Sequence, residues 1–133
     1  MARIDWALLC EHAFLDRREQ MCLIGLVRCL SAPRLPTAVH RLMLVARLAD
    51  INPVDEVDVS VGVVTPSGLH TARPGTGSVM ITMAGEYVLA TLHDFPLFEE
   101  GMYRFQIKLR GQQVVAVEIP VMAAEVEDAV AVQ

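Results

Sequence analysis

Residues 103–110 read Tyr-Arg-Phe-Gln-Ile-Lys-Leu-Arg, so that large apolar side chains alternate with cationic or amide side chains. Because successive side chains of a β-strand point to opposite faces, this period of two predicts a strand with one face in a core and the other in water. The predicted core residues of this strand are Tyr103, Phe105, Ile107 and Leu109. After Gly111 and Gln112 the alternation resumes at 114–121, so we expect the two segments to form a hairpin.

Further strands are expected in the middle of the chain. Every second residue from Val57 to Val63 is valine, and residues 65–68 read Thr-Pro-Ser-Gly, which places proline and glycine where a type I turn followed by a bulge needs them. Shorter strands are expected at 41–49, 69–73, 79–83 and 86–93, with connections at 31–40, 50–56 and 74–78, where proline or glycine recurs. About eight strand segments without a clear long helix are typical of a β-sandwich or barrel.

The N-terminal region admits two interpretations. Residues 4–15 fit the spacing of a strand and also that of a helix, and periodicity alone does not decide between them. The polar residues 16–20 have the length of a hairpin loop, and the apolar run from Met21 to Leu30 contains Gly25, which weakens a helix. We therefore favour two strands joined by a polar turn. Because both faces of 21–30 are almost entirely apolar, we expect this strand to be covered on two sides.

Length and composition bound the class of protein. A chain of 133 residues fits one domain with a single core. Apolar residues make up 53% of the chain and charged residues 20%, which leaves more apolar side chains than one small core hides and predicts self-association. We expect a sandwich domain at 1–121 and a tail at 122–133. Apolar residues of the tail have helical spacing, but so short and uncapped a segment is expected to fray or to be ordered only by docking.

Charge and cysteine content exclude several classes of partner. The 11 basic and 16 acidic residues give a net charge of −5, and the basic residues are scattered, so we expect no nucleic-acid partner and no membrane partner. No segment reaches the roughly 18 to 20 apolar residues of a membrane-spanning helix. The odd number of three cysteines and the absence of a signal-peptide pattern predict a cytoplasmic protein. We expect no cofactor, because Gly75-Thr76-Gly77 lacks the third glycine and the following helix of a dinucleotide site.

Two stretches resemble a known family. The first consists of Leu9-Cys10-Glu11-His12-Ala13, the polar turn after it and Leu23-Ile24-Gly25-Leu26, and the second is the hairpin from Phe95 to Pro120. Together they resemble a family of short bacterial proteins known only as a domain of unknown function. The resemblance favours strands over a helix in residues 6–30. It implies no reaction, because the family has no assigned catalytic or binding residues to carry over.

A third stretch, Gly101-Met102-Tyr103, resembles the tyrosine corner of Greek-key sandwiches such as immunoglobulin-like domains. In that motif a tyrosine at the start of a strand returns its hydroxyl to nearby backbone. The antibody arrangement of two core cysteines around a tryptophan is absent, because Trp6 precedes all the cysteines. We therefore expect an all-β fold, an antiparallel β-sandwich of about seven or eight strands with Greek-key, immunoglobulin-like topology.

Cys10 and His12 are the first candidates for chemistry. On a strand they lie on the same face, roughly 7 Å apart, which suits a thiolate–imidazole pair or two metal ligands. The simpler interpretation is a buried thiol beside a partly exposed imidazole, since no Cys-x-x-Cys motif accompanies them. An enzyme that uses these two residues is the third of our functional hypotheses.

Acidic residues in the predicted loops are the second candidates. Sandwiches can bind calcium where acidic loops converge at one end. The candidate ligands are Asp50, Asp55, Glu56, Asp94 and Glu99. Because these residues do not follow the spacing of a calcium-binding loop, solvated loop charge is the simpler interpretation. A sandwich that binds an ion or a small ligand is our second hypothesis.

The first hypothesis is a non-catalytic binding or assembly module that acts through protein–protein contact and self-association. It rests on the high apolar content, on the two-sided apolar run from Met21 to Leu30 and on the lack of a convergent catalytic set. The candidate contact residues are Trp6, Leu9, Ile24 and Leu26. The partner is expected to be a protein, and a second copy of the chain satisfies this expectation.

Overall fold

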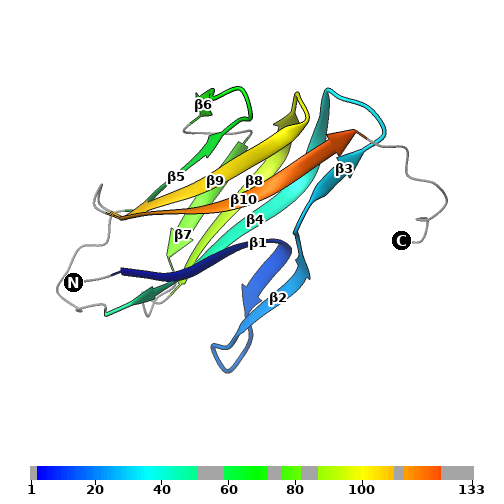
Figure 1. Ribbon diagram of the computed structural model, residues 1–133. Helices are drawn as coiled ribbons and strands as arrows, with labels where there is room; N and C mark the ends of the chain where they lie inside the picture. The colour runs from blue at the N-terminus through cyan, green and yellow to red at the C-terminus, as the bar shows by residue number, and fades with distance from the viewer. Residues whose placement is uncertain (1–2, 51–58, 72–75, 82–86, 110–112, 124–133) are drawn as a thin grey trace.

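The computed structural model describes residues 3–50, 59–71, 76–81, 87–109 and 113–123, which form two five-stranded β-sheets packed face to face (Figure 1). Sheet I contains, in spatial order, β2 (Met21–Leu26), β1 (Arg3–Leu15), β4 (Thr37–Ala49), β8 (Tyr87–Leu97) and β7 (Thr76–Ile81). Sheet II contains β3 (Leu30–Ala32), β10 (Gln113–Ala123), β9 (Gly101–Leu109), β5 (Val59–Val64) and β6 (His70–Thr71). The predicted all-β sandwich is confirmed. Among the described strands, eight have six or more residues, and β3 and β6 are shorter.

The strand order shows how the chain alternates between the sheets. β4 pairs with β1 and β8 rather than with its sequence neighbours β3 and β5, and every described pair is antiparallel except β3 with β10. The order β1-β4-β8-β7 facing β10-β9-β5 is the order of strands A, B, E, D facing G, F, C in the immunoglobulin fold. The chain passes from sheet I to sheet II between β8 and β9, which are joined by a short connection.

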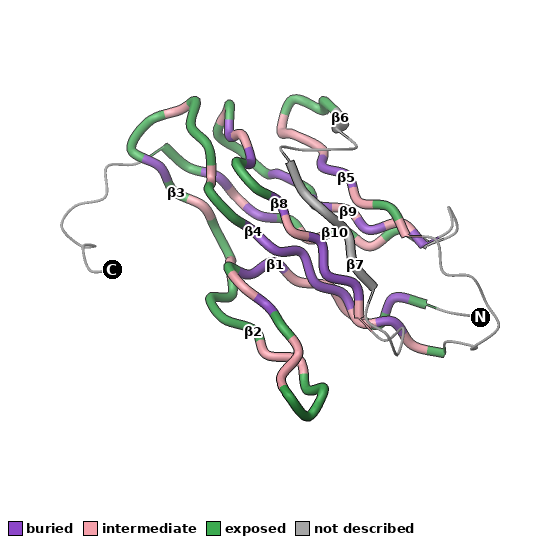
Figure 2. The backbone as a smooth tube through the Cα atoms, turned by 180° about the vertical axis from the view of Figure 1, so that it is seen from behind, coloured by how far each residue is buried: buried purple, intermediate pink, exposed green. Residues whose placement is uncertain are grey.

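The core lies between the two sheets. Tyr103, Phe105 and Ile107 of β9 are fully buried and Leu109 is 6% exposed, so the four residues predicted from the alternation lie in the core. Alternate residues of β4 face them from sheet I. Phe95 of β8 packs its ring against Tyr103 and Phe105, with centroid separations of 6.1 and 5.3 Å. Figure 2 shows the buried positions running along β4 and β8, whereas β2 is mostly exposed or intermediate.

Two hairpin turns share one construction. At the first turn, Asp16 N–H donates to Gln20 O and Glu19 N–H donates to Asp16 O, both at 3.0 Å. The same two bonds join Thr65 to Leu69 and Gly68 to Thr65 in the second turn. The fourth residue of each turn has a positive φ, 61° at Glu19 and 92° at Gly68, which is the bulge position. The type I turn with a bulge predicted at 65–68 is therefore present.

The predicted ends of several elements are wrong. The run from Met21 to Leu30 is not one strand, because β2 ends at Leu26 and Leu30 already belongs to sheet II. The connection predicted at 31–40 is confined to 33–36, because both prolines lie in these four residues and strands continue on either side. β7 begins at Thr76, inside the loop predicted at 74–78, and β8 continues four residues beyond its predicted end at His93. Residues 51–58, where most of one predicted loop falls, lie outside the described part.

The boundary predicted between domain and tail also moves. β10 continues through Ala123, where it pairs in parallel with Ala32 of β3. The backbone N–H of Ala123 donates to the Glu100 carboxylate at 2.8 Å. Met122 and Ala123 therefore belong to the sandwich and not to a helical tail. The remaining tail residues, 124–133, lie outside the described part of the chain.

Candidate functional site

The strand β1 continues beyond the point where its pairing with β4 ends. Its first part pairs with β4 from Arg3 to Cys10, and its second part pairs with β2 from Cys10 to Leu15. The second half of β1 and β2 therefore form a two-stranded hairpin that projects from one end of the sandwich (Figure 1). The outer edge of β2 pairs with no strand in the described part of the protein.

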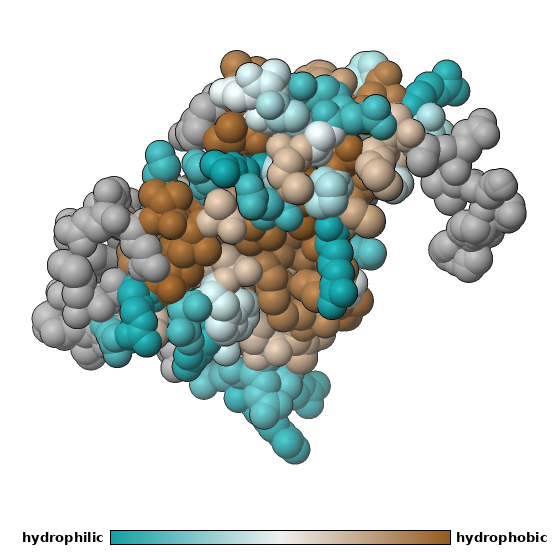
Figure 3. All heavy atoms as spheres, viewed as in Figure 1, coloured by the Kyte–Doolittle hydropathy of each residue, from teal (hydrophilic) through white to brown (hydrophobic). Residues whose placement is uncertain are grey.

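One face of this hairpin is apolar and open to solvent. The register places His12 across from Ile24 and Phe14 across from Cys22, and alternate residues share a face. Cys10, which lies across from Leu26, is buried, so we define the hairpin face as the remaining residues of this row: His12, Phe14, Cys22, Ile24 and Leu26. Phe14 is 39% exposed, Ile24 54% and Leu26 53%. In Figure 3 the hairpin turn at the bottom is hydrophilic, and apolar surface lies directly above it.

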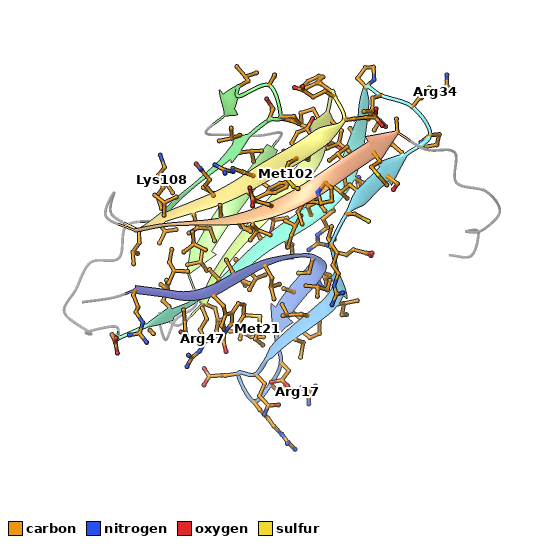
Figure 4. The ribbon with its side chains drawn as sticks, viewed as in Figure 1. Arg17, Met21, Arg34, Arg47, Met102 and Lys108 are labelled. Atoms are coloured by element: carbon orange, nitrogen blue, oxygen red, sulfur yellow. The ribbon has the colours of Figure 1, made fainter. Side chains whose placement is uncertain are left out.

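The expectation that the apolar run from Met21 is covered on two sides is wrong. Only the start of β2 is covered, because Met21 packs against a small cluster on the outer face of sheet I. Figure 4 shows Met21 beside that sheet. The buried members of this cluster are Cys10, Ala13, Met43, Val45 and Leu89. Met43 ties it to the hairpin, because its Sδ accepts the backbone N–H of Ala13 at 3.2 Å. The cluster anchors the hairpin on one side and leaves the hairpin face free.

The predicted contact residues divide into two groups. Ile24 and Leu26 lie on the hairpin face. Leu9 is fully buried between the sheets, so no partner can touch it, and the prediction for this residue is wrong. Trp6 is half-buried on the outer face of sheet I, with its ring centroid 6.2 Å from that of Tyr87. Phe14 was missed, because its place opposite Cys22 follows only once the turn at 16–20 fixes the register.

A groove of about 690 Å³ adjoins the root of the hairpin. It lies between the segment that follows β2 and the start of β4, and it shares His12 and Leu26 with the hairpin face. Its other lining residues are Glu11, Val27, Arg28, Cys29, Leu30, Val39, His40, Arg41 and Leu42. The buried Nδ1 of His12 makes no hydrogen bond. The groove therefore extends the apolar surface toward two arginines, which sequence patterns did not single out.

Cys10 and His12 do not form a reactive pair. The Cys10 thiol is buried and donates to the backbone carbonyl of His12 at 3.5 Å, rather than to the imidazole. Burial raises the pKa of this thiol above its ordinary value, so at neutral pH it remains protonated and is a poor nucleophile and a poor metal ligand. His12 lines the groove, but Cys10 does not. The geometry thus matches the simpler interpretation of a buried thiol beside a partly exposed imidazole.

The acidic candidates are separate from one another. Asp50 forms an ion pair with Arg3, and the Asp94 carboxylate lies 3.8 Å from Nδ1 of His40. Glu99 accepts a hydrogen bond from the Ser67 hydroxyl at 2.8 Å. Asp55 and Glu56 lie outside the described residues. In the described ranges no three histidine, cysteine or acidic residues are grouped so that they could hold a metal ion.

Comparisons with known proteins bear on the family and not on a reaction. The described residues contain no helix of the length and apolar character that a membrane crossing needs. A search of curated proteins finds no match to this sequence. The model of a family of unknown function, DUF6941, matches residues 5–122, which include both the hairpin and the sandwich. The chain therefore belongs to this family of unknown function, DUF6941.

Proposed function

We propose that this protein is a non-catalytic assembly module that acts through protein–protein contact, with the hairpin face as its contact surface. One observation carries the proposal: three large apolar side chains, Phe14, Ile24 and Leu26, are exposed together on a two-stranded hairpin, and the outer edge of its strand β2 is open. Exposed apolar patches and open strand edges are both features that proteins avoid unless they are used for contact.

The free energy of side-chain burial, compared with the cost of association, indicates which interactions a stable contact must include. Burying one large apolar side chain contributes roughly 1.5–3 kcal/mol, and these three are already about half buried, so they contribute about 2–4 kcal/mol together. Association costs about 4 kcal/mol or more in lost translational and rotational freedom. The three side chains alone do not offset this cost. A stable contact must therefore also use the backbone hydrogen bonds that the edge of β2 offers, as in strand addition to a sheet.

We further propose that the module works in the cytoplasm. All three cysteines have free thiols, and Cys29 is exposed. Exposed free thiols persist where cellular reductants keep disulfides rare.

Site-specific photo-crosslinking in cells tests the proposed function. A photoreactive amino acid is placed at Leu26 on the hairpin face or, as the matched control, at Leu69, which is equally apolar and 63% exposed in the turn between β5 and β6. We expect covalent protein adducts at position 26 and few at position 69. The adduct mass, followed by peptide mapping, shows whether the partner is a second copy or another protein. Equal yields at the two positions would overturn the proposal.

A further inference from the structure

We propose that β2 pairs antiparallel with β2 of a second copy of the chain, across a twofold axis at Ile24. The two copies of sheet I then form one continuous ten-stranded sheet. This inference rests on the proposed function, because it names the partner and the geometry of the same hairpin face.

The edge of β2 is unprotected. Soluble proteins protect open edges with charged side chains, with proline or with very short strands. The six residues of β2 read Met-Cys-Leu-Ile-Gly-Leu, without a charge or a proline. Of the other outer strands, β3 has three residues and β6 has two; β7 has six and also lacks a charge and a proline, but only its last three residues are apolar, since it begins with Thr-Gly-Ser. β2 is therefore the edge best suited to accept another strand.

Symmetry limits the possible registers. Two identical antiparallel strands related by a twofold axis perpendicular to the sheet must place one residue across from itself. With Ile24 on the axis, Cys22 lies across from the partner's Leu26, and Leu23 lies across from the partner's Gly25. Gly25 adds no side chain of its own to this pair, although the Glu11 side chain of the neighbouring strand lies over it. Every pair in this register is apolar.

The neighbouring register is less favourable. With Leu23 on the axis, the exposed Leu26 would lie across from the partner's polar Gln20 instead of an apolar residue. The charged turn at 16–19 lies outside the paired segment when Ile24 is on the axis, and Figure 4 shows Arg17 at the tip of the hairpin pointing away from the sandwich. The charges of the turn therefore need not be desolvated. An axis at Gly25 would pair Ile24 with the partner's Leu26, but it would set Cys22 across from the partner's charged Arg28. Cross-strand matching of apolar side chains therefore favours the axis at Ile24.

The same register joins the two hairpin faces. An axis perpendicular to the sheet keeps Phe14, Ile24 and Leu26 of both copies on one side of the joined sheet. The six side chains then form one continuous apolar strip in place of two separate patches. The backbone hydrogen bonds between the two β2 strands add to the stabilisation that these side chains contribute.

Sedimentation and light scattering of the full chain across a concentration series test the pairing. We expect the wild type to dimerise. Ile24→Lys places two like charges across from each other at the axis and should weaken dimerisation about tenfold or more. The control Met102→Lys introduces the same charge at a similarly exposed methionine of sheet II and should leave the dimer unchanged. Circular dichroism and thermal unfolding confirm that both variants are folded.

Disulfide trapping tests the register. In a background with Cys22→Ser and Cys29→Ser, Ile24→Cys should oxidise to a covalent dimer, because residues across from each other in a sheet have Cα separations that a disulfide can span. The control Leu23→Cys in the same background faces the partner's Gly25 and should oxidise far more slowly. A wild type that stays monomeric at every concentration, a dimer that survives Ile24→Lys, or faster trapping at 23 than at 24 would overturn the pairing. Adducts at position 26 with other proteins only would overturn the pairing and leave the proposed function standing.

Discussion

The hydroxyl of Tyr103 accepts the backbone N–H of Phe98 at 3.1 Å, across the connection at which the chain passes from sheet I to sheet II. The N–H of Glu99 lies 3.4 Å from the same oxygen. This is the contact of a tyrosine corner, and the tyrosine that makes it is fully buried in the core.

Removal of this hydroxyl should destabilise the fold without disturbing its packing. In Tyr103→Phe the ring remains, but the partly buried amide of Phe98 loses its acceptor, which costs about 1–3 kcal/mol. The free energy of unfolding from urea titration measures the effect. A change below about 0.5 kcal/mol, the range of ordinary surface substitutions, would contradict a structural role for the hydroxyl.

The core strand and the corner were predictable because their signals are local. From Tyr103 to Leu109 a polar residue separates each pair of apolar ones, so the period and the buried face are both given by the sequence itself. The turn at 65–68 was predictable for the same reason, since its proline and glycine meet conformational demands within four residues.

The exposure of the hairpin was not predictable from such signals. Leu9 and Ile24 are both apolar residues of apolar strands, yet Leu9 lies where β1 pairs with β4 under sheet II, and Ile24 lies beyond the end of that sheet pair. An apolar pattern specifies that a face should be covered, but not whether the same chain covers it. The passage of the chain from sheet I to sheet II after Leu26 was also not predictable, because residues 27–29 contain neither proline nor glycine to indicate a break between strands.

Three glycines with positive φ predict a graded series of alanine variants. At Gly68 an added Cβ meets nothing within 4 Å, so the cost is conformational only, roughly 1 kcal/mol. At Gly25 it would lie 2.7 Å from the Cδ of Glu11, a flexible side chain that can move, so the cost is slightly larger. At Gly101, with φ of 130°, it would lie 2.7 Å from the Cβ of Pro66, whose ring cannot move aside. Thermal unfolding should show Gly101→Ala as the most destabilised variant and Gly68→Ala as the least destabilised. A Gly68→Ala variant that is less stable than Gly101→Ala would contradict this account.

Calcium should leave the stability unchanged. Asp50 is paired with Arg3, and Asp94 and Glu99 make separate contacts, so these carboxylates do not converge on a site. Even weak calcium modules saturate near about 5 mM. We therefore expect the same unfolding temperature in about 5 mM CaCl₂ as in EDTA at matched ionic strength, because a ligand stabilises only the state that binds it. A rise with calcium that disappears in Asp55→Asn would instead place a site at the acidic segment 50–56.

Buried Cys10 should affect how stability depends on pH, as well as differing from Cys29 in reactivity.

Cys29 is exposed and should react with iodoacetamide in the native protein, whereas buried Cys10 should react only after unfolding, as peptide mass spectrometry measures. Desolvation raises the pKa of Cys10 in the folded state above its ordinary value of 9.0. As the pH rises, the Cys10 thiol therefore loses its proton in the unfolded chain before it does so in the folded protein. The stability that Cys10 contributes is complete below about pH 9 and declines as the pH rises toward the folded-state pKa. Cys10→Ala should be less stable at pH 7 because it leaves a small cavity, but its stability should fall less steeply above pH 9 than that of the wild type. Parallel slopes for the two proteins in that range would show that Cys10 does not titrate differently on unfolding.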